Sequence, residues 1–70
     1  MRYAIVIEKT ERNYGAYVLD LPGCIATGDT VEDVERNIRS AMEMHLAGMR
    51  EDGEAIPTPS SRVEYIDVAA

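Results

Sequence analysis

The sequence is poor in the residue types that bind metals or form covalent cross-links. It contains one cysteine, Cys24, and one histidine, His45, among its 70 residues. A single cysteine excludes an internal disulfide, and neither residue has a partner at the spacing of a zinc site. We therefore expect no metal and no cofactor, and we expect Cys24 to be a small packing residue.

Basic residues are also scarce. Lys and Arg together number 7 against 13 Asp and Glu, so the formal net charge is −6 at pH 7. Direct binding to nucleic acid needs basic patches that face phosphate, and this charge balance argues against it. The same balance favours solubility and electrostatic steering towards a basic partner.

Long apolar runs are missing as well. No stretch approaches the ~20 apolar residues of a membrane-spanning helix. The first residues, Met1, Arg2, Tyr3 and Ala4, do not start the apolar core of a signal peptide. We therefore expect a cytoplasmic protein that does not interact with a membrane.

The length of 70 residues predicts a single domain that spans residues 1–70. The core of so small a domain rarely supplies more than about 3–5 kcal/mol, so such domains usually need disulfides, a metal or association with another chain. Because the first two are excluded by composition, we expect a homodimer or a higher oligomer.

The start of the chain is typical of a β-hairpin. Residues 2–8 and 14–21 are rich in β-branched and aromatic types, and the linker between them is short and polar. Pairing Lys9 with Tyr14 sets a register in which both faces of the sheet are apolar. The chain's own helix can cover one face, which leaves the other for a second copy or for a partner protein.

A turn, a short strand and a helix follow. Pro22 fixes φ and Gly23 accepts a positive φ, which predicts a type II turn before a third strand at residues 24–27. Thr30 is a suitable helix N-cap, and apolar residues then recur at helical spacing. Gly53 is a suitable stop for this helix.

The end of the chain predicts one more strand. Prolines beyond the helix exclude its continuation, and residues 62–68 have strand character. The order strand, strand, strand, helix, strand (β-β-β-α-β) predicts an α+β fold with one helix packed on a small mixed sheet. A right-handed crossover places the last strand beside the first.

Four segments together resemble the N-terminal domain of the HicB family of antitoxins. They are Tyr-Gly-Ala-Tyr-Val-Leu-Asp-Leu-Pro-Gly-Cys at 14–24, Ala-Thr-Gly-Asp-Thr-Val-Glu-Asp at 26–33, the helical stretch 37–46, and Glu-Asp-Gly-Glu-Ala-Ile-Pro at 51–57. The resemblance extends over residues 1–60. It implies a partial, degraded ribonuclease-H-like fold, regarded as catalytically dead, and a partner: a small basic HicA-like toxin that cleaves mRNA with a histidine, which the antitoxin covers.

One property of the family, DNA binding, is not expected of this chain. Full-length members of the family usually have a DNA-binding domain after this one, whereas this sequence ends at Ala70. We therefore expect no C-terminal DNA-binding domain and no operator binding by this chain.

For contact with a toxin we single out the sheet edge, the turn after the second strand and nearby acidic residues. The candidate partner-binding residues are Asp20, Leu21, Pro22, Gly23, Cys24 and Asp29. Two alternatives stay open at this point. One is an orphan homo-oligomeric scaffold without a toxin, and the other is a small regulatory module that binds a small molecule.

The acidic residues do not indicate an active nuclease. Two-metal catalysis requires several carboxylates around ions ~3.5–4 Å apart, whereas Glu8 lies at the hairpin end of its strand and Asp29 and Asp33 belong to the start of the helix. His45 lies within the apolar stripe of the helix, so we expect a packed or interface histidine with a satisfied hydrogen bond. We therefore expect no enzymatic activity.

Overall fold

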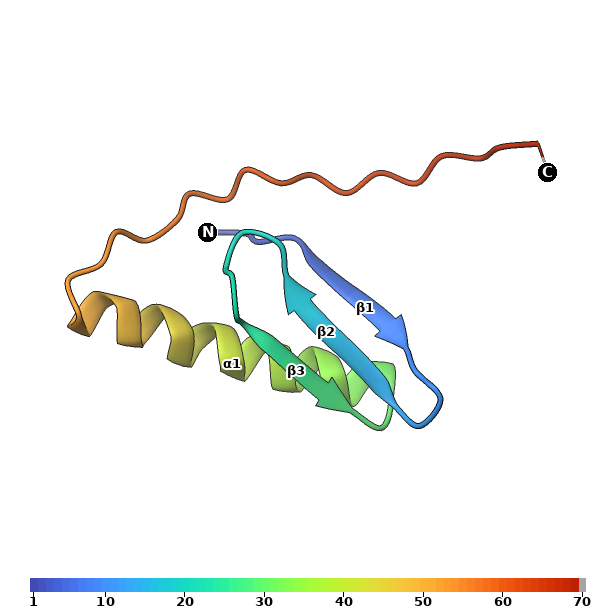
Figure 1. Ribbon diagram of the computed structural model, residues 1–70, viewed down its shortest axis with the longest axis horizontal. Helices are drawn as coiled ribbons and strands as arrows, with labels where there is room; N and C mark the ends of the chain where they lie inside the picture. The colour runs from blue at the N-terminus through green and yellow to red at the C-terminus, as the bar shows by residue number, and fades with distance from the viewer. Residues whose placement is uncertain (70) are drawn as a thin grey trace.

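The computed structural model describes residues 1–69, which form three strands followed by one helix (Figure 1). The strands are β1 (Ile5–Lys9), β2 (Tyr14–Val18) and β3 (Ile25–Gly28), and the helix is α1 (Val31–Glu51). The strands form one antiparallel sheet in the order β1-β2-β3, and α1 lies against one face of it. The α+β class is confirmed, with the element order β-β-β-α.

The hairpin has the expected register. Lys9 lies opposite Tyr14, and Ile7 lies opposite Ala16. The loop between β1 and β2 is closed by the Thr10 amide, which donates to the Asn13 carbonyl at 2.8 Å. The register gives the sheet an inner face towards α1 and an outer face that α1 does not cover.

The caps of α1 are also those that the sequence predicts. The Thr30 hydroxyl accepts a hydrogen bond from the Asp33 amide at 3.0 Å. At the other end Gly53 has φ +70°, and the amides of Gly53 and Glu54 donate back into the last turn of the helix. This pattern is a Schellman motif, which satisfies carbonyls that a helix end leaves free.

The core lies between α1 and the sheet, on the side of β2 and β3. Its buried residues are Ala16, Val18, Leu21, Cys24, Val34 and Ile38. Helix α1 packs on β3 and β2 and hardly touches β1. The inner side chains of β1, Ile5 and Ile7, are consequently only half-buried.

The expected last strand at residues 62–68 is wrong for this structure. The described residues after α1 contain no strand, so the sheet has three strands and is wholly antiparallel rather than mixed. The segment runs past the N-terminus in an extended course and leaves the body of the molecule (Figure 1). Contacts from Pro57 to Ser61 hold it at the end of the sheet, and they are described below. The ribonuclease-H-like character of the fold stays a prediction.

Candidate partner-binding surface

Asp20 follows the end of β2, and its carboxylate binds a segment 40 residues further along the chain. Its Oδ2 accepts hydrogen bonds from the amides of Ser60 and Ser61, both at 2.9 Å, and its Oδ1 accepts from the Ser61 hydroxyl at 2.7 Å. Nearby, the Tyr3 hydroxyl donates to the Pro57 carbonyl at 2.6 Å. We call these five residues the clasp, because they fasten residues 57–61 to the end of the sheet.

The clasp is expected to depend on pH. The amide of Ser61, then its hydroxyl and the amide of Ser60, favour the ionised carboxylate and lower the pKa of Asp20 below its ordinary value. A lowered folded-state pKa means that the stabilising contribution is present above the unfolded pKa of about 3.9 and is lost as pH falls through the folded value. Amide resonances of Ser60 and Ser61 in NMR spectra should therefore shift on acidification below about pH 3.9.

The same resonances give a test at neutral pH. In Asp20→Asn the Ser60 and Ser61 amides should exchange faster with solvent, since the charged acceptor is gone. Asp29→Asn is the matched control, because the Asp29 side chain makes no hydrogen bond within residues 1–69. Unchanged exchange in Asp20→Asn would mean that the clasp does not hold the segment in solution.

The turn after β2 contains both buried and exposed residues. The Cys24 amide donates to the Leu21 carbonyl at 3.1 Å, and Gly23 has φ +82°, as a type II turn requires. Pro22 and Gly23 form the exposed tip. Leu21 and Cys24 point inward and are buried, and burial raises the pKa of the Cys24 thiol. These two residues, expected at a contact surface, therefore belong to the core.

Asp29 lies at the opposite end of β3 from this turn. Four strand residues separate the two places, which corresponds to roughly 13 Å along an extended strand. Asp29 is exposed and directly precedes the N-cap of α1. The structure therefore does not bring Asp29 together with the other candidate residues, and only Pro22, Gly23 and Asp29 are fully exposed among the six.

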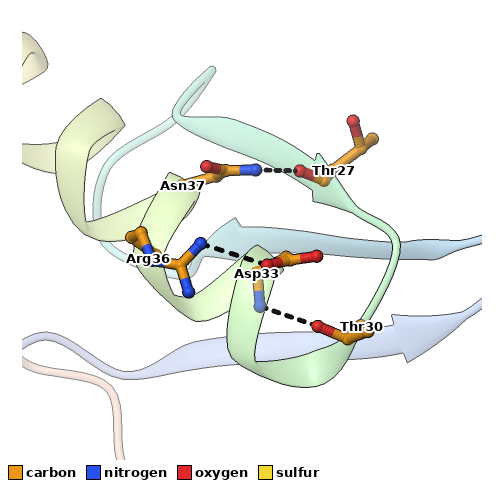
Figure 2. A network of polar contacts seen from close by, with 5 residues as sticks. All are labelled: Thr27, Thr30, Asp33, Arg36 and Asn37. Carbon is orange, nitrogen blue, oxygen red and sulfur yellow. Dashed lines mark hydrogen bonds and ion pairs between the residues drawn. The ribbon is translucent and has the colours of Figure 1, made fainter.

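One side chain of helix α1 binds a backbone carbonyl on the free edge of β3. Asn37 Nδ2 donates to the Thr27 carbonyl at 2.8 Å, as Figure 2 shows beside the Thr30 cap and the Asp33–Arg36 ion pair. The Thr27 carbonyl faces away from β2, because the alternate residues of β3 form the ladder. The edge of β3 is thus partly occupied by the protein itself.

The edge of β1 has no such cover. The Leu19 amide donates to the Ala4 carbonyl at 3.1 Å, which shows that Ala4 and every second residue after it bond to β2. The amides and carbonyls of Ile5 and Ile7 therefore face the open side of β1. An open edge of this kind can accept an added strand.

The outer face of the sheet is apolar and uncovered. Val6, Tyr17 and Ile25 lie side by side across the three strands, and Leu19 extends the row on β2. Ile25 has 69% of its surface exposed. Exposed apolar patches often mark sites of protein association. We call these four residues the outer face. These four residues were not among the candidate residues predicted from the sequence. The apolar residues at alternate positions of both hairpin strands were the sequence signal that could have identified them.

Within residues 1–69 no three His, Cys, Asp or Glu side chains converge in a group that could hold a metal ion. His45 is half-buried on α1. Among the described residues, no helix has the length and apolar character needed to cross a membrane.

Comparisons with known proteins agree on one family. A family model described as a HicB-like antitoxin of bacterial toxin-antitoxin systems matches residues 3–69. A relative from Haemophilus phage HP1, an uncharacterised 14.9 kDa protein, is 39% identical over 67 residues. The match covers 96% of this chain and 50% of the phage protein, so the chain spans half the length of that relative.

Two solved structures share the fold. A chain of the HicA3 and HicB3 toxin-antitoxin complex superposes with a TM-score of 0.74 at 30% identity, covering 86% of this chain and 70% of that one. The N-terminal domain of the antitoxin HicB from Burkholderia pseudomallei gives a TM-score of 0.69 at 34% identity, covering 81% of this chain and 68% of that one.

Proposed function

The chain belongs to the family of HicB-like antitoxins of bacterial toxin-antitoxin systems, and from this premise we propose that it binds and covers a small basic, mRNA-cleaving HicA-like toxin. The observation that carries the proposal is the likeness, in both sequence and fold, to a chain of a toxin-antitoxin complex. The net charge of −6 supports it, because an acidic inhibitor attracts a basic target.

The outer face and the turn tip form the contact surface in this proposal. Ile25, Tyr17 and Leu19 supply apolar area, and Pro22 and Gly23 border it at the end of the sheet. Asp20, Leu21 and Cys24 act indirectly, because they hold the turn and the clasp in place. Asp29 contributes negative charge at the start of α1, where it helps to steer the toxin during association.

Inhibition by covering needs binding alone. The proposed mode of action is therefore non-enzymatic, uses no cofactor and involves no direct contact of this domain with nucleic acid. The role places the protein in the cytoplasm, where the toxin meets its mRNA. Self-association of the chain, as a homodimer or a higher oligomer, is part of the same proposal because the open edge of β1 can accept a strand from another molecule.

The test is a titration of RNA cleavage. A small basic candidate toxin, taken from the genomic neighbourhood of this chain, is incubated with RNA, and the protein is added stepwise. Cleavage should stop at a stoichiometric ratio, and light scattering should detect the complex. Ile25→Asp should raise the concentration needed for inhibition about tenfold or more, since it places a charge in the centre of the contact.

Met44→Asp is the matched control for this variant. Met44 is an exposed apolar residue on α1, with 75% of its surface exposed, and it lies away from the outer face. The Met44→Asp variant should inhibit the toxin as well as the unchanged protein does. Undiminished cleavage at excess protein, with no complex detected, would reject the antitoxin role and favour a homo-oligomeric scaffold, which the uncovered outer face also fits.

Association with the toxin should depend strongly on salt. Steering between an acidic and a basic protein raises the association rate by about tenfold or more at low ionic strength, and added salt screens it. The double charge reversal Asp29→Lys with Glu32→Lys should slow association at low salt while leaving the dissociation rate nearly unchanged. Stopped-flow measurements check both rates, and an association rate that is indifferent to salt would contradict the electrostatic part of the proposal.

A further inference from the structure

The C-terminal segment, residues 62–68, has the composition of a strand but no partner within the described chain. Every residue in it is exposed, and Tyr65 and Ile66 have 95% and 81% of their surface free. The radius of gyration is 13.8 Å, whereas a compact chain of this length has about 11 Å. The excess reflects this segment, which leaves the body of the molecule in Figure 1.

A groove lies where a further strand would complete the core. It has a volume of about 470 Å³, and it separates the start of β1 from α1. Its apolar floor consists of Ile5, Ile38, Met42 and Leu46. The groove exists because α1 packs on β3 and β2 and leaves the inner side of β1 only partly covered. It continues the open edge of β1, where the amides of Ile5 and Ile7 have no partner within residues 1–69.

The groove is lined by both acidic and basic side chains, the acidic ones being Glu35 and Glu43. Arg2, Arg39 and Arg50 line it, and within residues 1–69 none of the three forms an ion pair. The C-terminal segment carries Glu64 and Asp67 beside one basic residue, Arg62, which pairs with Glu64 at 2.7 Å. The three arginines of the groove can attract Glu64 and Asp67, in competition with Arg62 for Glu64.

The clasp keeps the segment off the β1 edge of its own molecule. Asp20 holds Ser60 and Ser61 at the end of the sheet. Residues 62–64 border a hollow that they share with residues 2–5 without pairing as a strand, and the chain then extends beyond the body of the molecule. A segment that is anchored at its base and extended beyond the body is suited to reach a neighbouring molecule. Exchange of such an element between identical chains is a low-cost route to a dimer.

We propose that two copies of the chain exchange their C-terminal segments, each segment adding a strand to the open edge of β1 in the other copy. Its seven residues span about 23 Å when extended, enough to follow the five residues of β1. Glu64, Ile66 and Val68 share one side of a strand. Ile66 and Val68 then fill the groove, and Glu64 meets its arginines. The inference rests on the proposed self-association and names the segment and the edge that form it.

The first test compares two variants of the full chain by light scattering over a range of concentrations. The double variant Ile66→Lys with Val68→Lys should weaken dimerisation about tenfold or more, and since both side chains are exposed in the single molecule, its fold should be unchanged. Ile25→Lys, on the outer face, should remain dimeric. The reverse result, with Ile25→Lys monomeric and the segment variant dimeric, would overturn the proposal in favour of a dimer through the outer face.

The second test uses charge exchange between two variants. Arg39→Glu reverses a charge of the groove and Glu64→Arg reverses a charge of the segment, so each variant alone should dimerise more weakly than the unchanged chain. In an equimolar mixture both contacts of the exchanged dimer regain opposite charges, and the heterodimer should form. A mixture that stays as weak as its components would overturn the exchange.

Hydrogen–deuterium exchange of backbone amides distinguishes a segment paired with β1 of a second molecule from a segment paired with β1 of its own molecule. The amides of Ile5 and Ile7 should be protected in the dimer and unprotected in the Ile66→Lys, Val68→Lys monomer. Protection in a monomeric sample of the unchanged chain would show that the segment pairs with its own β1, which rejects the proposal. None of these measurements uses a toxin, so their failure and the failure of the antitoxin role are told apart.

Discussion

Replacing Gly28 with alanine is expected to unfold much of the protein. A Cβ atom at this position would lie 2.5 Å from the Val34 amide nitrogen and 2.9 Å from the Val34 Cα. Both are backbone atoms at the start of α1, so neither can move without shifting the helix on the sheet. Overpacking costs about 1–3 kcal/mol and occasionally more, while a domain of this size has only about 3–5 kcal/mol available.

Thermal melts followed by circular dichroism measure this effect. Each kcal/mol lowers the melting temperature of a domain this small by about 4–8 °C, so a cost of about 1–3 kcal/mol in Gly28→Ala should lower it by about 4–24 °C. Gly15→Ala is the matched control in the neighbouring strand, because no atom lies within 4 Å of its added Cβ. It should melt close to the unchanged protein. Equal melting temperatures for the two variants would show that α1 does not approach β3 as closely as the structure has it.

The role of Gly28 illustrates what local sequence patterns do not contain. Local sequence alone would place this glycine, two residues before the Thr30 N-cap, in a turn before the helix. In the structure its φ is not positive, and it lies at the end of β3 opposite Tyr14. Glycine is needed here because α1 crosses so close above it, which is a tertiary contact that no spacing in the sequence reveals.

The features that could be predicted are those fixed within a few residues. The pairing of Lys9 with Tyr14 follows from the short loop between the hairpin strands, and the helix caps at Thr30 and Gly53 follow from their own side chain or backbone freedom. Each of these depends on neighbours in the sequence. They were predictable because the physics that sets them is local.

The features that could not be predicted depend on residues far apart in the chain. Asp20 was expected at a partner surface, but its carboxylate holds Ser60 and Ser61. Residues 62–68 have strand character, yet strand composition does not say which edge is available, and the clasp carries the segment away from β1. Leu21 and Cys24, two of the candidate residues, are buried for the same reason, since burial of a turn residue depends on what packs beneath it.

Leu21→Ala is expected to have the second large effect, and it tests this last point. Leu21 has no exposed surface and is among the largest fully buried side chains. Its truncation removes apolar contacts at the junction of the turn and α1 and leaves a cavity, at a cost of about 2–5 kcal/mol. Urea unfolding should show a lower midpoint with a similar slope, whereas Leu21→Met, which nearly conserves volume, should lose less than about 1.5 kcal/mol.

Leu19→Ala provides the contrast two residues earlier in the chain. Leu19 belongs to the outer face with 39% of its surface exposed, so its truncation should cost clearly less stability while weakening inhibition of the toxin. Leu21→Met should inhibit the toxin as well as the unchanged protein, because a buried residue holds the turn without touching the partner. If Leu21→Met lost inhibition at full stability while Leu19→Ala kept it, the contact would include the turn interior, and the outer face would lose its place in the proposed complex.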